Sequence, residues 1–299
     1  MAHLPDVPCA DFYADQLLAQ GYYIIPKAIA SDEVEALTSD LAEDFDATHL
    51  SSGPFYGNDT RRFGSLLSRS DRTKAFVQHP TILAIMQKIL GPWCDHFSLN
   101  LTQAIELMPG SIEQVPHRDQ DMWPCSRFVD SALQVEFLVN VMWPFTPYTK
   151  ENGATQVWPG SHRRLDEMLI DPTQAIVAEM EPGSALLFLG STLHAGGANR
   201  SALPRRGMII SYTLGWLKPY ELQWLAYPPE VARTFDADLT DLLGYRIHRP
   251  NLGNYEGRCP SHLLRETERK SGAIDMLAPE HHALIETFRA GGLPEPVTG

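Results

Sequence analysis

The feature that most constrains the fold is a series of short apolar segments between residues 95 and 218, each closed by turn residues. β-Branched and aromatic residues in short runs between Gly, Pro and Asn turns are typical of antiparallel strands. This pattern predicts a mainly β protein with flanking helices, built around a β-sandwich or jelly roll. The segments expected to be strands are 97–108, 133–143, 154–158, 185–189 and 207–216.

Helical signals lie on either side of this strand-rich part. Residues 11–20 predict a short helix, and residues 22–26 a strand. Ser31 is expected to cap a second helix, in which Val34, Leu37, Leu41 and Phe45 recur at helical spacing. Because helices come first and last, we expect them to pack outside one face of the double sheet.

Three further segments complete the predicted organisation. Pro80 opens a helix that ends at Gly91-Pro92, and residues 49–72 form an irregular loop. The Pro-rich stretch 219–299 contains short helices near 229–244 and 279–289. We expect a single domain over residues 1–299, with N-terminal helices in 1–94, a jelly-roll core at about 95–218 and a lid or tail in 219–299.

Composition narrows the classes of partner. The net charge of −13 disfavours nucleic acid and anionic membranes, because an acidic surface repels both. The four cysteines are scattered without a CxxC pair, a pattern that indicates reduced thiols and a cytoplasmic location. The first residues show no signal-peptide pattern, and no window has the apolar length of a membrane span.

The triplet His117-Arg118-Asp119 carries the chemical prediction. On an extended segment, His117 and Asp119 project to the same face, and His194 from a distant strand would complete three ligands on one side of a metal. Two histidines and one carboxylate with the opposite side open suit a non-haem Fe(II) oxygenase. Alone, an H-x-D triplet is more often a local hydrogen bond or cap, and His194 could equally be a histidine satisfied at a strand end.

Arg205 and Arg206 open the segment 207–216 and follow the same reasoning. A buried arginine needs an anionic partner, and a bound dicarboxylate would supply one through bidentate pairing. If one of the two points into the barrel, its neighbour must point to solvent. The alternative is that both are charges on the rim of the barrel.

Four ordered motifs carry a family resemblance. Residues 151–162, ENGATQVWPGSH, resemble the ENG…PGSH signature of the phytanoyl-CoA dioxygenase superfamily. Residues 194–205, from HAGGANRS to Arg205, resemble its H-x-G-x-x-N-x-S…R signature, and the N-terminal GYYIIP with the helix after it is also similar. The resemblance runs from about residue 15 to 245, and it implies the double-stranded β-helix (cupin-like jelly roll) of the Fe(II)/2-oxoglutarate dioxygenases.

The resemblance also implies roles for individual residues. His117, Asp119 and His194 match the iron ligands of the family, and Arg205 matches the arginine that binds the far carboxylate of 2-oxoglutarate. Thr155 and Gln114 match positions that contact 2-oxoglutarate in some members. His162 of the PGSH motif is expected to be structural. Since halogenases on this scaffold lack the carboxylate, Asp119 predicts an enzyme that does not halogenate.

The implied reaction uses Fe(II), 2-oxoglutarate and O₂ to oxidise a C–H bond of a small molecule, with release of succinate and CO₂. The HRDxxxW and ENGAT sequences are more similar to members that modify secondary metabolites than to the lipid-degrading ones. Three alternatives remain open: an acyl-CoA or lipid hydroxylase of the same family, a catalytically inactive binding protein on this fold, and a cupin-like isomerase or hydrolase that does not use 2-oxoglutarate.

The substrate is expected to be largely apolar, because pockets are usually lined by apolar and aromatic residues. Loop 49–72 and the tail near 219–260 are the expected lids, and Arg61, Arg62 and Arg118 either meet a substrate acid or lie in solvent. Members of the natural-product branch are often homodimers, which makes a homodimer possible here. The residues expected to line the pocket are Phe55, Tyr56, Phe63, Met122, Trp123, Phe137 and Trp224.

Overall fold

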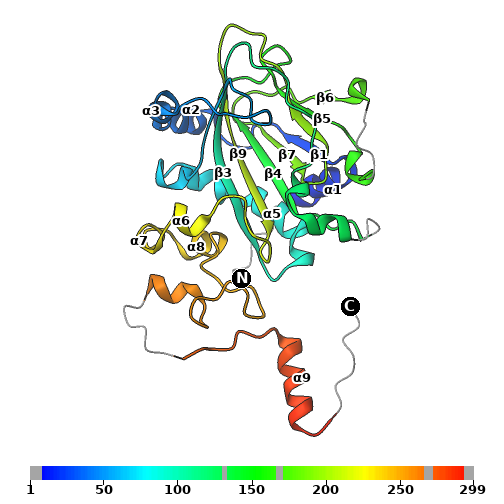
Figure 1. Ribbon diagram of the computed structural model, residues 1–299, viewed down its shortest axis with the longest axis vertical. Coiled ribbons are helices and arrows are strands. Elements are labelled where there is room, and N and C mark those ends of the chain that lie inside the picture. The colour runs from blue at the N-terminus through cyan, green and yellow to red at the C-terminus, as the bar shows by residue number, and fades with distance from the viewer. Residues whose placement is uncertain (1–8, 130–132, 166–170, 266–271, 293–299) are drawn as a thin grey trace.

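The computed structural model describes residues 9–129, 133–165, 171–265 and 272–292 (Figure 1). Residues 1–8, on which the expectation of no signal peptide partly rests, lie outside these ranges. The α-helices are α1 (Ala10–Gln20), α2 (Ser31–Asp40), α3 (Ala42–Ala47), α4 (Thr73–Val77), α5 (Pro80–Ile89), α6 (Gln223–Ala226), α7 (Pro229–Ala232), α8 (Ala237–Leu242) and α9 (Pro279–Arg289). The strands are β1 (Tyr22–Ile25), β2 (Thr60–Phe63), β3 (Phe97–Leu107), β4 (Leu138–Pro144), β5 (Thr155–Val157), β6 (Ile176–Val177), β7 (Ala185–Leu189), β8 (His194–Gly196) and β9 (Arg205–Leu214).

The strands form two antiparallel sheets. The larger has the order β1-β7-β4-β9-β3-β2, and the smaller has the order β6-β5-β8. Strands far apart in the sequence are therefore neighbours, as when β9 pairs with both β3 and β4. This arrangement confirms the predicted class, a mainly β jelly roll with flanking helices.

The central strands separate a helix-covered face from an inner face. On β4, Val139, Val141 and Trp143 belong to the hydrophobic core that also contains residues of α1, α2 and α5. Met142, one position along, packs instead with residues such as Phe188 on the inner side. Because side chains alternate along a strand, every second residue of β4 is directed toward the space between the sheets.

The flanking helices behave differently at the two ends of the chain. The N-terminal helices contribute fully buried residues to the large core, among them Leu17 of α1, Leu37 of α2 and Ile85 of α5. The C-terminal helix α9 has no buried residue and extends away from the sheets (Figure 1). The expectation that the last helices also cover a face of the sheet is therefore wrong for α9.

Three local predictions need correction. Ser31 is the first helical residue of α2 rather than its cap; Ala30 holds the cap position with no side-chain hydrogen bond. Segment 49–72 contains the edge strand β2, which pairs with β3. The predicted strand at 133–143 begins only at Leu138. In the described ranges, every helix is too short or too polar to cross a membrane.

Candidate metal centre and cavity

Two segments that are distant in sequence lie side by side to form the centre. The backbone of His117 exchanges two hydrogen bonds with the backbone of His194, each of 3.0 Å. Next to this pair, the Gln114 N–H donates to the Gly196 carbonyl at 2.9 Å. The segment that carries His117 therefore runs antiparallel to β8, which places both imidazoles on one surface.

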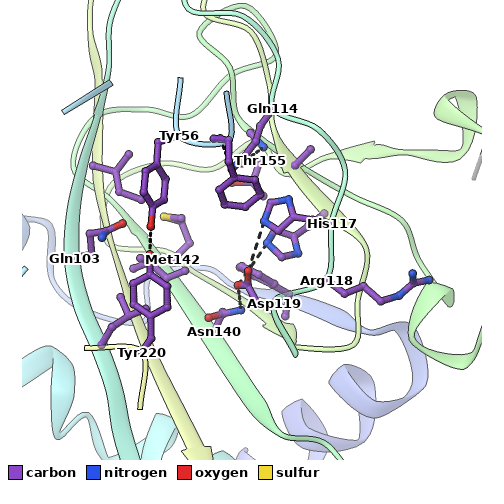
Figure 2. Close-up of a pocket in the computed structure, with 18 of the residues that line it drawn as sticks. Tyr56, Gln103, Gln114, His117, Arg118, Asp119, Asn140, Met142, Thr155 and Tyr220 are labelled. Atoms are coloured by element: carbon purple, nitrogen blue, oxygen red, sulfur yellow. Dashed lines mark hydrogen bonds and ion pairs between the residues drawn. The ribbon is translucent and has the colours of Figure 1, made fainter. Parts of the chain in front are cut away.

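The three predicted metal ligands converge, and Figure 2 shows His117 directed toward Asp119. Nε2 of His117 lies 3.5 Å from Oδ1 of Asp119, and Nε2 of His194 lies 3.6 Å from Oδ2 of the same carboxylate. One ligand atom from each of the three residues lies within 4.8 Å of the other two. Among the described residues this is the single group of this kind, so the structure brings together the residues that the sequence singled out.

Backbone carbonyls determine which nitrogen of each histidine is available. Nδ1 of His117 lies 2.9 Å from the Val115 carbonyl, and Nδ1 of His194 lies 3.0 Å from the Thr192 carbonyl. A carbonyl oxygen only accepts, so each Nδ1 carries the proton and donates it. Both Nε2 atoms therefore keep a free lone pair directed at the shared position, as a metal ligand requires.

The charges of the centre also suit a cation. Burial disfavours the ionised form of Asp119, but in the acid range, where the histidines are protonated, the charge of His194 and hydrogen bonds from His117 and Asn140 outweigh it and lower the pKa of Asp119 to about 2. Burial lowers the pKa of His194 to about 4, although the charge of Asp119 opposes this. At neutral pH the centre thus offers a carboxylate and a neutral imidazole, the ligand forms that bind a divalent metal.

The centre lies in the wall of a cavity of about 410 Å³ between the two sheets. Aromatic and aliphatic side chains supply much of its surface, and a few polar groups converge in it, as is usual for small-molecule sites. Its lining residues include Phe55, Tyr56, Arg62, Asn100, Gln103, Gln114, Met122, Leu138, Asn140, Thr155, Phe188, Arg205, Ile209 and Tyr220.

Arg205 is a buried cation in the wall of this cavity. It is only 4% exposed, its Nη1 donates to the Gly153 carbonyl, and its guanidinium lies 4.4 Å from the ring centroid of Tyr148. Its Nε is buried without a hydrogen-bond partner. No carboxylate among the described residues pairs with Arg205, so the protein supplies this guanidinium with a carbonyl and an aromatic face but no counter-charge.

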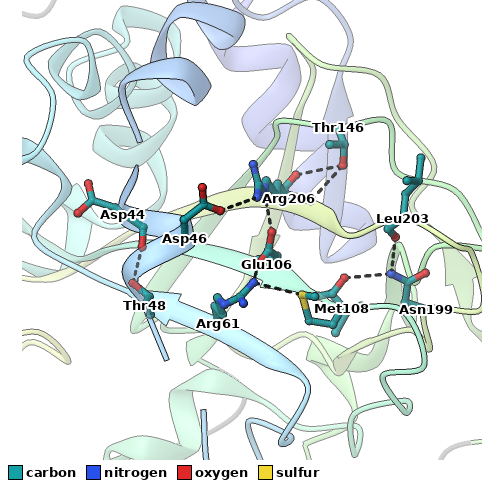
Figure 3. Close-up of polar contacts among 11 residues, drawn as sticks. Asp44, Asp46, Thr48, Arg61, Glu106, Met108, Thr146, Asn199, Leu203 and Arg206 are labelled. Carbon is teal, nitrogen blue, oxygen red and sulfur yellow. Dashed lines mark hydrogen bonds and ion pairs between the residues drawn. The ribbon is translucent and has the colours of Figure 1, made fainter. Parts of the chain in front are cut away.

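Arg206 follows Arg205 on β9 and so projects from the other face of the strand, where it lies beside Glu106 (Figure 3). Its Nε donates to Oε1 of Glu106 at 2.6 Å, and Arg61 of β2 donates to the other oxygen of the same carboxylate. Register places Arg61, Glu106 and Arg206 directly opposite one another on β2, β3 and β9. The alternation of the two arginines is as predicted, but Arg206 does not simply point to solvent, because the fully buried Glu106 pairs with it.

A second arginine, Arg62, also lines the cavity. Its Nη1 donates to Oε1 of Gln103 at 3.2 Å, and its guanidinium lies 5.1 Å from the ring centroid of Tyr56. Burial lowers the pKa of Arg62, and the nearby Arg205 charge lowers it further. Two guanidinium groups that repel one another in one cavity favour an anionic ligand between them.

The remaining sequence-predicted residues lie as follows. Thr155 of β5 and Gln114 both line the cavity. The Gln114 amide already bonds within the protein, accepting from the Gly196 N–H at 3.2 Å and donating to the Phe55 carbonyl at 3.2 Å. His162 lies outside the metal group, and its Nε2 is 3.0 Å from the Leu18 carbonyl, in agreement with a structural role.

Several expectations for the pocket were wrong. Arg118 does not lie in solvent: it is 4% exposed, and its side chain donates to the carbonyls of Ser191, Ser161 and Arg164. These contacts connect the triplet His117-Arg118-Asp119 to the loop before His194.

Four residues expected in the pocket do not line the cavity, because nearness in sequence to a motif did not predict the direction of their side chains. They are Phe63, Trp123, Phe137 and Trp224.

Other cavity residues were missed by sequence reasoning. Asn140 donates to Asp119 at 2.9 Å, and the hydroxyl of Tyr220 hydrogen-bonds that of Tyr56 across the cavity (Figure 2). A polar residue inside the apolar run LQVEFLVNVMW was the one available signal for Asn140. Nothing local marks Tyr220, because its position depends on how the tail folds back onto β3.

The family model described as phytanoyl-CoA dioxygenase (PhyH) matches residues 17–207. Among characterised sequences, the chain is similar to the dioxygenase trt7 of Aspergillus terreus, with 30% identity over 243 residues that cover 78% of this chain and 83% of that protein. It is also similar to the dioxygenase FrzG of a Cladobotryum species, with 34% identity over 206 residues that cover 65% of this chain and 67% of that protein.

Solved structures show the same fold at low identity. The chain resembles the non-haem α-ketoglutarate-dependent epimerase SnoN from nogalamycin biosynthesis with a TM-score of 0.55 and 18% identity, covering 70% of this chain and 84% of that one. HygX from Streptomyces hygroscopicus, solved with nickel and 2-oxoglutarate, gives a TM-score of 0.55 with 14% identity, covering 70% and 89%. The match extends the jelly-roll assignment to most of the chain.

Proposed function

The chain belongs to the phytanoyl-CoA dioxygenase family, and from that premise we propose that it is an Fe(II)/2-oxoglutarate-dependent dioxygenase. It oxidises a C–H bond of a largely apolar small molecule, a secondary metabolite, and releases succinate and CO₂. One observation carries the proposal: three metal-ligand side chains meet in the wall of a cavity that also holds the buried Arg205, for which the described residues supply no carboxylate.

Fe(II) is held by Nε2 of His117, Nε2 of His194 and the carboxylate of Asp119. The donor set fits this ion, because two neutral imidazoles and one carboxylate on one side leave the other side open for co-reactants. When bound, the iron supplies the oxygen activation that no side chain provides. Since Asp119 occupies the carboxylate position, no place is left for a halide, and the enzyme does not halogenate.

2-Oxoglutarate carries a carboxylate at each end, and the cavity offers a cationic group for each. Arg205 binds the far carboxylate, because a guanidinium with free N–H groups pairs with it in a bidentate and directional way. The metal centre receives the other end of the molecule. Thr155 and Gln114 line the same cavity and are proposed to contact 2-oxoglutarate, and Arg62 adds positive charge to the cavity.

The substrate occupies the part of the cavity that 2-oxoglutarate leaves free. Phe55, Tyr56, Met122 and Leu138 give this part an apolar surface, which exposes an apolar substrate to the metal while excluding water. Tyr56 belongs to segment 49–72 and Tyr220 to the tail, and their hydroxyl contact supports the proposal that these two segments act as lids. On the same fold, SnoN belongs to nogalamycin biosynthesis and HygX was solved with hygromycin B bound, which agrees with a natural-product substrate.

The wider setting follows from the same family. We propose that residues 1–299 act as one catalytic domain, with O₂ and 2-oxoglutarate as co-substrates and neither nucleic acid nor membrane as a partner. The net charge of −13 supports the exclusion of nucleic acid. The four free cysteines support a cytoplasmic location, and the natural-product branch of the family supports a homodimer.

The test is succinate formation by the purified protein with Fe(II), 2-oxoglutarate, ascorbate and O₂. The wild-type protein is expected to release succinate in an iron-dependent way, slowly alone and faster when a fitting metabolite is added from a panel. A folded His194→Ala variant is the matched control and is expected to release none above background. Absence of iron-dependent succinate from folded wild-type protein would favour a binding protein or a 2-oxoglutarate-independent enzyme.

A further inference from the structure

Three polar side chains cross the inner face of the large sheet, one from each of three adjacent strands. Asn100 of β3, Ser211 of β9 and Asn140 of β4 are all 0% exposed, and the two asparagines line the cavity. Asn140 is the register partner of Ser211, and Nδ2 of Asn100 donates to Oγ of Ser211 at 2.9 Å. Buried amides in the centre of a sheet are unfavourable unless they are hydrogen-bonded, so their presence here calls for a reason.

Asn100 owes its place to an irregularity in β3. The register between β3 and β9 shifts between Leu99 and Leu101, so the residue between them is left out of the regular pairing. Such bulges redirect a side chain and are common beside active sites. Asn100 then uses both ends of its amide, donating to Ser211 and accepting from the Tyr220 N–H at 2.7 Å. Both the nitrogen and the oxygen of this amide therefore have a partner.

Asn140 is different, because only half of its amide has a partner. Its Nδ2 donates to Oδ2 of Asp119 at 2.9 Å, whereas its Oδ1 is buried with no hydrogen-bond partner. The orientation of the amide is fixed by chemistry: an ionised carboxylate only accepts, so the nitrogen must face Asp119. Figure 2 shows the oxygen on the other side, toward Tyr220.

We propose that Asn140 is a positioning residue with two functions: its amide N–H orients Asp119 toward the metal, and its carbonyl oxygen accepts a hydrogen bond from an O–H or N–H group of the substrate. The proposal rests on the proposed function and narrows its substrate class. The substrate is an apolar molecule with a hydrogen-bond donor near the carbon that is oxidised, since the accepting oxygen belongs to the residue that touches a metal ligand.

The free oxygen gives the cavity a preference among apolar molecules. A ligand without a donor leaves Oδ1 of Asn140 unsatisfied once water is displaced, and an unsatisfied buried acceptor is costly. A ligand with a donor removes that penalty. The same hydrogen bond also fixes the orientation of the ligand relative to the metal. Tyr56 and Tyr220 do not meet this need, because their hydroxyl groups lie against one another and neither is a hydrogen-bond partner of Oδ1 of Asn140.

The first arm of the test measures metal affinity without turnover, by calorimetric titration of Mn(II) into the anaerobic apoprotein. Asn140→Leu is expected to weaken binding by about 10- to 100-fold, as loss of a group that orients a ligand typically does. Asn140→Val, which is smaller, suits a strand and also lacks a donor, serves as a second variant in case leucine impairs folding. Thr213→Val is the control: it removes a fully buried polar group of the neighbouring strand β9, bonded to the Phe137 carbonyl, and should leave affinity unchanged.

The second arm uses the protein loaded with Ni(II) and 2-oxoglutarate, which does not turn over, and two probes, indole and 1-methylindole. For each protein we compare the dissociation constant of 1-methylindole with that of indole. This ratio is expected to be about fivefold or more higher in the wild type than in Asn140→Leu, which corresponds to one net hydrogen bond. Unchanged Mn(II) affinity in both Asn140 variants would overturn the orienting role. An equal probe ratio in wild type and variant, or no binding of indole, would overturn the accepting role. Neither arm uses succinate formation, so failure of the proposed oxidation is distinguishable from failure of this inference.

Discussion

The arginines on the two faces of the β2-β3-β9 part of the sheet differ in whether a carboxylate pairs with them. On the outer face, Arg61 and Arg206 share the buried carboxylate of Glu106, which lies between them on β3 (Figure 3). On the inner face, Arg62 and Arg205 are their immediate neighbours in sequence, and neither pairs with a carboxylate among the described residues. The same residue type, one position apart, is neutralised on one side of the sheet and left charged on the other.

The difference indicates what each face is for. A buried or half-buried arginine with its own carboxylate needs nothing further and contributes to the structure. A buried arginine without a carboxylate partner favours the binding of an anionic ligand. In this chain such an arginine lies in the cavity that contains the metal ligands. Outer-face changes should therefore alter stability, and inner-face changes should alter affinity for 2-oxoglutarate.

The largest effect is expected at Arg205. Arg205→Met removes the bidentate partner of the far carboxylate and should raise the dissociation constant of 2-oxoglutarate by about 100- to 1,000-fold, as loss of a desolvated charge pair does. Arg206→Met is the matched control on the outer face and should change that constant by less than about threefold. Anaerobic calorimetric titration measures both, and the reverse ranking would show that the two faces are assigned the wrong way round.

Glu106→Gln tests the outer face. Loss of the carboxylate leaves Arg61 and Arg206 without a counter-charge, and we expect the free energy of unfolding to fall by about 2–4 kcal/mol. Affinity for 2-oxoglutarate should stay near the wild-type value while the protein is folded. Urea unfolding provides the measurement. A strong loss of 2-oxoglutarate binding with unchanged stability would contradict the assignment of stability to the outer face and of 2-oxoglutarate binding to the inner face.

Glu136 is the converse case, a buried carboxyl group without a cation among its described contacts. Burial raises its pKa to about 7, although hydrogen bonds from Ser191 oppose the shift from 4.5. The folded state therefore binds this proton more tightly, so its stabilising contribution is complete below pH 4.5 and is lost as pH rises to about 7.

Glu136→Gln should remove this dependence on pH. Between pH 5 and 8, the free energy of unfolding of the wild type should fall by about 1–3 kcal/mol relative to the variant. Urea unfolding of both proteins at several pH values gives the difference. A difference that is flat with pH would mean that the carboxyl is neutralised by a partner after all.

The smallest effect is expected at Arg62. It is partly exposed and donates to Gln103, so Arg62→Met should raise the dissociation constant of 2-oxoglutarate by only about 10-fold. The reason is loss of positive charge near the anion rather than loss of a bidentate contact. If titration shows no change at all, Arg62 serves the substrate side of the cavity, and the inner face has one anion-binding arginine instead of two.

How much the sequence could predict depended on whether the signal was local. The strands β3, β7 and β9 and the helices α1 and α5 have clear periodicity, and their positions were predicted within a few residues. β2 was missed because its four residues, TRRF, include two charges and no apolar alternation; it is identified only by its pairing with β3.

The same limit applies to the centre. His117, Asp119, His194 and Arg205 stand in spacings that identify them, and the structure brings all four to one cavity. Glu106, Asn140 and Tyr220 were not predicted, because each acquires its role from a partner on another strand or loop. Phe63 and Trp224 were wrongly placed in the pocket for the same reason, since nearness in sequence does not fix the direction of a side chain.

The central claim is that His117, Asp119 and His194 hold one ferrous ion that also receives 2-oxoglutarate. Its most direct test is visible absorption of the anaerobic protein as Fe(II) and then 2-oxoglutarate are added. A weak charge-transfer band that needs both additions, and that is absent from a folded His194→Ala variant, is the predicted result. No band in folded wild-type protein, or an equal band in the variant, would contradict the account.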